Sequence, residues 1–144
     1  MAQVRSWAGL DVQWASVVAA TMDRESGELR VRRLPAATRD VVAFCVGLPG
    51  PALVAYEAGP TGFTLVRALV DAGVGCVVAA PGKIERPASD RVKTDERDAQ
   101  RLLRLLMVDG LHAVRVPSVQ EEALRDLVRA REDVRGDLMR RATG

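Results

Sequence analysis

Apolar and polar residues follow a strand-like pattern in three short runs within the first third of the chain. These runs cover residues 4–12, 14–23 and 27–35. The connections between them are short, and the second contains the turn-forming residues Ser26 and Gly27. Because short connections join antiparallel neighbours, the pattern predicts a three-stranded meander.

Segments with helical spacing then alternate along the chain with continuous apolar runs. Thr38 precedes apolar residues at helical spacing, so we expect it to cap the first helix. Pro60 suits the first turn of a second helix, and Gly73 suits its end. The apolar runs are short, as expected for strands that are buried on both faces. The predicted elements are a helix over 37–50, a strand over 51–57, a helix over 60–73 and a strand over 74–81.

A charged segment separates these elements from a leucine-rich helix. Residues 82–92 are expected to form a loop, whereas helical spacing resumes at Thr94 and continues to about Val108. The order β-β-β-α-β-α-β-α favours an α/β fold, with a mixed sheet that has helices on both faces. It is the order of the RNase H-like fold, which we expect over residues 1–112.

Residues 113–144 predict a separate C-terminal helix. Ser118 and Glu121 have the spacing of a capping box at its start. Apolar residues then recur at alternating three- and four-residue steps, which is typical of a coiled coil, although an arginine interrupts the stripe. The stripe consists of Leu124, Leu127, Arg131, Val134 and Leu138. It would pack either against the rest of the chain or against a second copy, and both alternatives stay open.

Composition narrows the class of protein. The 144 residues suffice for one domain with a hydrophobic core, and the net charge of +2 does not by itself indicate nucleic-acid binding. No apolar run reaches the roughly 18 residues that span a membrane, and the first residues lack a signal-peptide core, so we expect a cytoplasmic protein with no membrane partner. Cys45, Cys76 and His112 are too few and too dispersed for a zinc site, so we expect reduced thiols.

Two acidic residues lie where acids are uncommon. Asp11 is inside the apolar run of the first strand, and Glu57 ends the fourth. If these strands are neighbours, their ends bring the two side chains together. Asp95 and Asp98 lie three residues apart in the first turn of the leucine-rich helix and share one helical face. We expect this face to approach Asp11 and Glu57.

Four converging carboxylates need positive charge. Two like charges about 4 Å apart repel by roughly 4 kcal/mol at an effective dielectric constant near 20. Mg²⁺ removes this repulsion, since it binds one or two carboxylates together with water and phosphate oxygens. Two such ions about 4 Å apart are suited to phosphodiester cleavage. The four acids therefore predict metal-assisted phosphoryl transfer on a nucleic acid.

Each acid also has an ordinary explanation. Asp95 would be a favourable first-turn residue and Asp98 a solvated one. Asp11 would cap a hairpin turn, and Glu57 would pair with an arginine such as Arg91. The consistent placement of all four in one fold favours the metal site.

Four stretches, in order along the chain, carry a family likeness. They are GLDV (9–12), YEAGPTGF (56–63), VVAAPGKI (77–84) and DRVKTDERDAQRL (90–102). Through them the chain resembles the N-terminal domain of the DEDD-type insertion-sequence transposases, the group that includes the Piv and MooV DNA invertases. The resemblance implies a RuvC-like domain, which is a branch of the RNase H fold.

The resemblance also implies a chemistry and partners. It maps the four-acid motif onto catalytic and metal-binding roles for Asp11, Glu57, Asp95 and Asp98. It implies two Mg²⁺ ions, for which Mn²⁺ would substitute, and cleavage and transfer of DNA strands in transposition, guided by a structured RNA from the element. Members have a second domain with a serine implicated in strand transfer, so we expect this chain to be the N-terminal half of a longer protein. The C-terminal stripe adds the expectation of a homodimer or higher oligomer.

Basic residues before the leucine-rich helix are candidate nucleic-acid contacts. Lys83, Arg91 and Lys93 are expected to bind phosphates, because cations beside a metal site attract a polyanion. Members of the family often carry a lysine shortly after the first aspartate, where this chain has Gln13 and Trp14. That departure removes a basic contact from the first hairpin but leaves the metal ligands in place.

Two functions from other classes fit parts of the pattern. Actin-like ATPases and sugar kinases share the order of elements, but the sequence after Asp11 lacks the Gly and Thr that those enzymes place there. A non-catalytic nucleic-acid-binding module could dimerise through the last helix. An aromatic content of 3% argues against recognition of single strands by base stacking.

Overall fold

A computed structural model describes residues 3–59, 61–82 and 94–143. The chain divides into two compact units, Met1–Val114 and Arg115–Gly144. Among the described residues, no helix is both long enough and apolar enough to cross a membrane.

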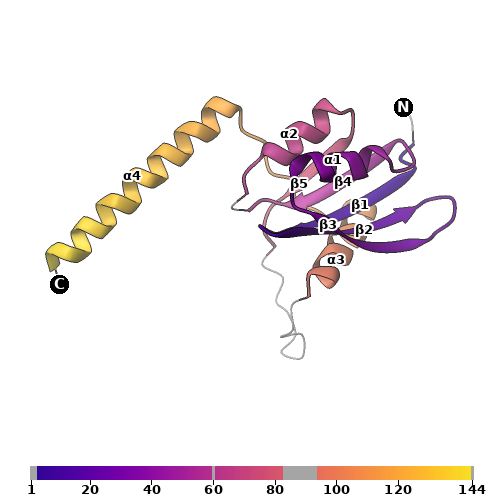
Figure 1. Ribbon diagram of the computed structural model, residues 1–144, viewed down its shortest axis with the longest axis horizontal. Coiled ribbons are helices and arrows are strands. Elements are labelled where there is room, and N and C mark those ends of the chain that lie inside the picture. The colour runs from indigo at the N-terminus through magenta and orange to yellow at the C-terminus, as the bar shows by residue number, and fades with distance from the viewer. Residues whose placement is uncertain (1–2, 60, 83–93, 144) are drawn as a thin grey trace. The chain divides into compact units, whose positions relative to one another are not determined.

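The first unit is built around a five-stranded mixed sheet (Figure 1). β1 (Ser6–Val12), β2 (Ser16–Asp23) and β3 (Leu29–Pro35) form an antiparallel meander, while β4 (Ala52–Glu57) and β5 (Gly75–Ala79) continue the sheet in parallel with β1. The strand order β3-β2-β1-β4-β5 places β1 at the centre and makes β4 its neighbour. Only β2 runs against the other four strands. This is the arrangement of the RNase H-like fold, so the predicted fold class is confirmed.

Helices cover both faces of the sheet. α1 (Thr38–Val46) and α2 (Thr64–Asp71) pack together on one face, and α3 (Asp95–Met107) packs on the other, mainly against β1 and β2 (Figure 1). A buried hydrogen bond connects the first face to its helices, because the Tyr56 hydroxyl accepts from the Val66 amide at 3.1 Å. The central strands are therefore enclosed on both sides.

β1 and α3 approach each other closely at Gly9. A Cβ atom on Gly9 would lie 2.4 Å from the carbonyl oxygen of Ala99 and 2.5 Å from the amide nitrogen of Leu103. Val18 and Ala20 of β2 pack in one cluster with Ala99 and Leu103. The absence of a side chain at Gly9 and the small one at Ala99 therefore set the distance between α3 and the sheet.

Two helix starts differ from the expectation. Ala37 is the N-cap of α1, because its carbonyl oxygen accepts the first helical hydrogen bonds, and Thr38 is already inside the helix. α2 begins at Thr64, because Gly62 has a φ of +77° that a right-handed helix does not accommodate. Pro60, predicted to lie in the first turn, is outside the described residues.

Both cysteines are free thiols, as expected. Burial raises the pKa of Cys45 to about 11 and that of Cys76 to about 12. Neither side chain is therefore a reactive thiolate near neutral pH.

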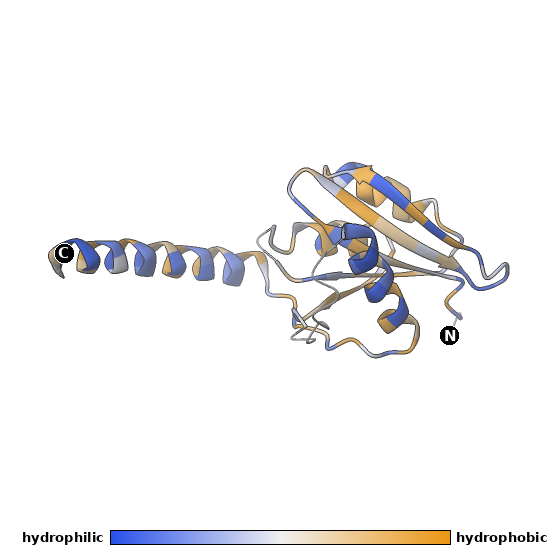
Figure 2. Ribbon diagram, turned by 90° about the horizontal axis from the view of Figure 1, so that it is seen from below, coloured by the Kyte–Doolittle hydropathy of each residue, from blue (hydrophilic) through white to orange (hydrophobic). Residues whose placement is uncertain are grey.

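The second unit contains α4 (Val119–Thr143), whose residues are mostly hydrophilic (Figure 2). The Ser118 hydroxyl oxygen accepts from the Glu121 amide at 3.1 Å, as the predicted capping box requires. The Glu121 carboxylate accepts two hydrogen bonds from Arg115, at 2.8 and 3.0 Å, and this contact lowers the pKa of Glu121 to about 2. The apolar residues of the predicted stripe are 60–68% exposed, and they are Leu124, Leu127, Val134 and Leu138.

We expect Gly9→Ala to lower the free energy of unfolding by about 2–3 kcal/mol, because the added methyl group overlaps backbone atoms of α3. Urea denaturation followed by circular dichroism measures the loss. Gly47→Ala is the matched control, since a Cβ there would find its nearest neighbour at 3.4 Å and φ is −75°. A similar loss of unfolding free energy in both variants would contradict a close contact between Gly9 and the backbone of α3.

Candidate carboxylate site

Asp11 lies near the end of β1, on the face of the sheet that α3 covers. Side chains alternate along a strand, so Trp7, Gly9 and Asp11 share one face. Gly9 faces the backbone of α3, and Trp7 packs against the cluster that contains Ala99 of α3. The same alternation directs the carboxylate of Asp11 to the α3 side.

The first turn of α3 supplies two more carboxylates. Thr94 caps the helix, because its hydroxyl oxygen accepts from the Arg97 amide at 3.3 Å. Asp95 and Asp98 follow in the first turn, where the positive end of the helix dipole favours negative charge. Both side chains are partly buried, and the Oδ2 oxygen of Asp98 is enclosed by protein. The cap therefore fixes the part of α3 that carries both acids.

The carboxylates of Asp95 and Asp98 lie close enough to Asp11 to raise its pKa. The pKa of Asp11 is raised to about 6, first because burial removes water from its carboxylate. A hydrogen bond with Asp95 and the charges of Asp95 and Asp98 also raise this pKa, whereas a hydrogen bond from Gln13 lowers it. Two carboxyl groups can share a hydrogen bond only when one carries a proton. Asp11 and Asp95 therefore form a pair that is stabilised by a proton or by a cation.

Glu57 is the neighbour of Asp11 along the sheet. β1 and β4 pair in parallel with Leu10 opposite Tyr56, so the next positions, Asp11 and Glu57, lie beside each other and share a face. Glu57 is exposed, however, and does not contribute to the raised pKa of Asp11. Within the described residues, no three acidic, histidine or cysteine side chains are grouped as a complete metal site. The structure thus brings three of the four predicted acids together and leaves Glu57 at their edge.

Gln13 is a site residue that the sequence analysis did not predict. Its side-chain amide donates to both carboxylate oxygens of Asp11, at 3.2 and 3.3 Å. A glutamine orients the carboxylate without adding the positive charge that a lysine would bring. The available signal was its position two residues after Asp11, on the same face of the chain.

Arg33 is a second residue that the sequence analysis missed. Val18 is opposite Asp11 on one side and opposite Arg33 on the other, so the three form a row across the sheet. Arg33 lies 3.8 Å from a carboxylate oxygen of Asp95 and donates to the Ser16 hydroxyl at 2.7 Å. The ion pair is largely exposed and contributes little stability. Its effect is to place a positive charge beside the carboxylates.

Three basic residues were predicted to contact phosphates. These residues, Lys83, Arg91 and Lys93, lie outside the described residues. Their place immediately before α3 in the sequence is therefore the only positional information about them.

The donor set suits a hard divalent cation. Every candidate ligand is a carboxylate oxygen, and Mg²⁺ requires only one or two of these together with water. A cation beside Asp11 would offset the negative charges of Asp95 and Asp98 and would so favour the ionised form of Asp11. Asp11, Asp95 and Asp98 are the residues that would hold it, with Glu57 next along the sheet.

We expect Asp11→Asn to stabilise the metal-free protein by about 1 kcal/mol at pH 8, because it removes a partly buried carboxylate beside two others. A raised pKa means that the folded state favours the protonated acid. Wild-type stability is therefore fully supported below about pH 3.8 and falls as the pH rises through about 6. The gain from Asp11→Asn should shrink as the pH falls from 6 to 4.

Thermal melts in buffers without divalent cations, at pH values between 4 and 8, measure this gain. Asp71→Asn, at an exposed position at the end of α2, is the matched control. A gain that stayed constant down to pH 4 would show that folding does not raise the pKa of Asp11.

Comparison with known proteins identifies relatives of the same kind. A family model for IS110-type DEDD proteins, described as "Transposase", matches residues 8–143. The chain is 55% identical over 76 residues to "Putative transposase y4qE" of Sinorhizobium fredii, which covers 53% of this chain and 20% of that protein. It is 44% identical over 90 residues to "Transposase for insertion sequence element IS1533" of Leptospira borgpetersenii, with 59% and 25% covered. The matched part thus spans about a quarter or less of these curated relatives.

Among solved structures, the chain is similar to the catalytic core domain of BIV integrase. The TM-score is 0.34 at 10% sequence identity, with 87% of this chain and 96% of that one covered. This likeness is too weak to support a structural conclusion, whereas the family match extends over nearly the whole sequence. The chain belongs to the IS110-type DEDD transposase family.

Proposed function

We propose that the first unit is the catalytic domain of a transposase and cleaves DNA strands in a reaction that depends on Mg²⁺. The observation that carries the proposal is the meeting of Asp11 with Asp95 and Asp98, at the end of the central strand and the start of α3. Membership of a transposase family supports DNA as the substrate. It also favours this function over an actin-like ATPase or a non-catalytic module.

The metal would supply the reactive chemistry, and the protein would position the metal. When bound, divalent cations would supply an activated water and stabilisation of the leaving oxygen of a phosphodiester. Asp11 would hold them from the rigid centre of the sheet, and Asp95 and Asp98 from the capped end of α3. Gln13 keeps the carboxylate of Asp11 oriented toward α3.

Positive charge beside the acids supports binding of a polyanion. Arg33 lies 3.8 Å from Asp95 and places a positive charge beside the carboxylates, where it could contact a phosphate. We infer that Lys83, Arg91 and Lys93 add phosphate contacts from the segment that precedes α3 in the sequence. A structured RNA from the element would guide the full-length protein to its DNA, as the family likeness implies.

The second unit supports pairing of two copies of the chain. Leu124, Leu127, Val134 and Leu138 recur at heptad spacing on α4 and are exposed. Two such stripes would bury each other and produce a homodimer, which would place two catalytic domains in one assembly.

We expect Mg²⁺ or Mn²⁺ to raise the melting temperature of the wild type, because an ion that binds only the folded state stabilises it by about 2.7 kcal/mol at a hundredfold excess over its Kd. Asp11→Asn combined with Asp95→Asn should abolish the shift. Asp71→Asn combined with Asp40→Asn removes equal charge elsewhere and should keep it. Differential scanning fluorimetry measures the shifts, and nicking of a supercoiled plasmid in Mn²⁺ measures activity. Equal shifts in both double variants would refute the metal site.

We expect Leu127→Glu combined with Val134→Glu to convert a dimer into a monomer, because both charges would enter the apolar stripe of α4. Arg129→Glu changes the net charge by the same two units outside the stripe and should leave the dimer intact. Multi-angle light scattering reports the mass. A monomeric wild type at high concentration would contradict the pairing.

A further inference from the structure

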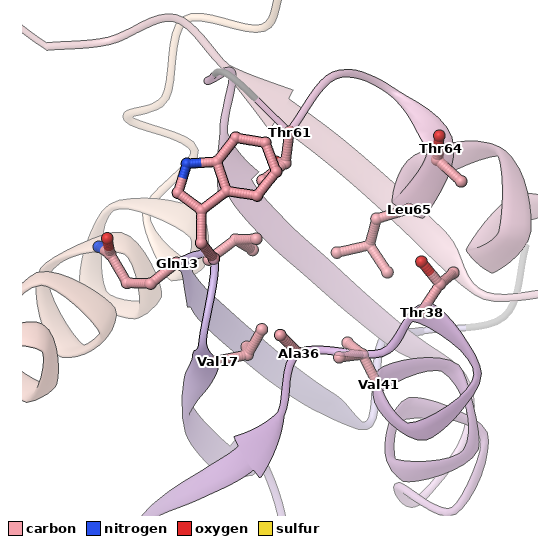
Figure 3. Close-up of a pocket in the computed structure, with 10 residues that line it drawn as sticks. Gln13, Val17, Ala36, Thr38, Val41, Thr61, Thr64 and Leu65 are labelled. Atoms are coloured by element: carbon pink, nitrogen blue, oxygen red, sulfur yellow. The ribbon is translucent and has the colours of Figure 1, made fainter.

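A pocket lies on the other side of the sheet from the carboxylates. The turn between β1 and β2, the start of α1 and the start of α2 form its walls (Figure 3). Its volume is about 170 Å³. The lining residues are Val12, Gln13, Trp14, Val17, Ala36, Thr38, Val41, Thr61, Thr64 and Leu65.

The pocket and the carboxylate site share the turn that follows β1. Gln13 donates to Asp11 on the α3 side, and its side chain points away from Thr38 and Thr64 (Figure 3). Trp14, the next residue, lines the pocket and is 74% exposed. The pocket and the carboxylate site therefore meet at the same short turn at the end of β1.

The chemistry of the walls selects a neutral, flat ligand. Val17, Val41 and Leu65 are buried and supply apolar contact. The lining set contains no charged residue, so it supplies no cation to balance the charge of a free phosphate. Threonine hydroxyls both donate and accept hydrogen bonds, which suits a ligand that carries both donors and acceptors along its edge. Trp14 adds an exposed aromatic surface.

These properties match a nucleobase. A cavity of about 150 Å³ holds a ring of the size of benzene, so a pocket of about 170 Å³ suits a single-ring base. Stacking of one base on an aromatic side chain contributes about 1–3 kcal/mol. An exposed tryptophan beside hydroxyl groups supplies both the stacking surface and partners for the base edge.

We propose that this pocket binds one unpaired pyrimidine base of the nucleic-acid strand whose neighbouring phosphate lies at Asp11, Asp95 and Asp98. The inference rests on the proposed function for the phosphate, whereas the base would bind in the pocket, which shares Gln13 with the carboxylate site. Binding of this one base would fix the position of the strand along the protein, while the carboxylate site acts on the phosphate backbone.

The test measures binding of short labelled oligonucleotides in Ca²⁺ by fluorescence anisotropy. Oligothymidylate and oligouridylate distinguish DNA from RNA, and an abasic strand of equal length and charge isolates the contribution of the base. We expect the base-containing strand to bind more tightly than the abasic one. Trp14→Ala should reduce that advantage at least fivefold, as loss of one stacked base requires.

Four variants separate the pocket from general effects. Ala36→Leu fills the pocket and should remove the advantage, whereas Trp14→Phe preserves an aromatic ring and should retain most of it. Val46→Ala shortens an exposed apolar side chain outside the pocket and should change nothing. Trp7→Phe leaves Trp14 as the sole tryptophan, so quenching of its emission by oligothymidylate reports contact directly.

The outcomes distinguish this inference from the proposed function. Equal affinity for base-containing and abasic strands, or no effect of Trp14→Ala, would overturn the pocket while the metal-dependent melting shifts still stood. Absence of any strand binding by the wild type would overturn it as well. A shift of Trp14 emission with protein concentration alone would show that a second copy of the chain fills the pocket, and would likewise refute the proposal.

Discussion

The close approach of α3 to β1 is the contact on which the candidate site depends. At Gly9 the helix backbone occupies the space where a side chain would begin, and Ala99 keeps the facing side equally small. Leu103 and the β2 residues around it then hold the helix by apolar packing. Because α3 is fixed at this distance, its first turn meets Asp11 two residues further along β1. A helix displaced outward by one side chain would separate the acids.

That geometry places negative charges together at the expense of stability. Burial and the two neighbouring acids raise the pKa of Asp11 to about 6, while the hydrogen bond from Gln13 lowers it. Perturbed carboxylates of this kind concentrate at functional sites. Apolar packing thus holds the site in place, and the proposed cations would relieve the repulsion between its carboxylates.

The turn after β1 gives the domain two chemically different sides. Toward α3 it carries the amide that orients Asp11, and toward α1 and α2 it carries Trp14 and the neutral pocket. Gln13 and Trp14 follow one another in this turn, so one short segment contributes a side chain to each site. One short segment can therefore serve both the backbone and a base of the same strand.

The sequence by itself determined the order of elements, the fold class and the acids worth attention, because periodicity and turn residues are carried by consecutive positions. It did not determine the start of α1, where the backbone of Ala37 provides the cap, or that of α2, where the conformation of Gly62 delays the helix. It also could not show that Arg33 reaches Asp95 or that Glu57 stays exposed beside Asp11. Those facts depend on strand register and on the distance between α3 and the sheet. Only the packing of residues far apart in the sequence sets such quantities.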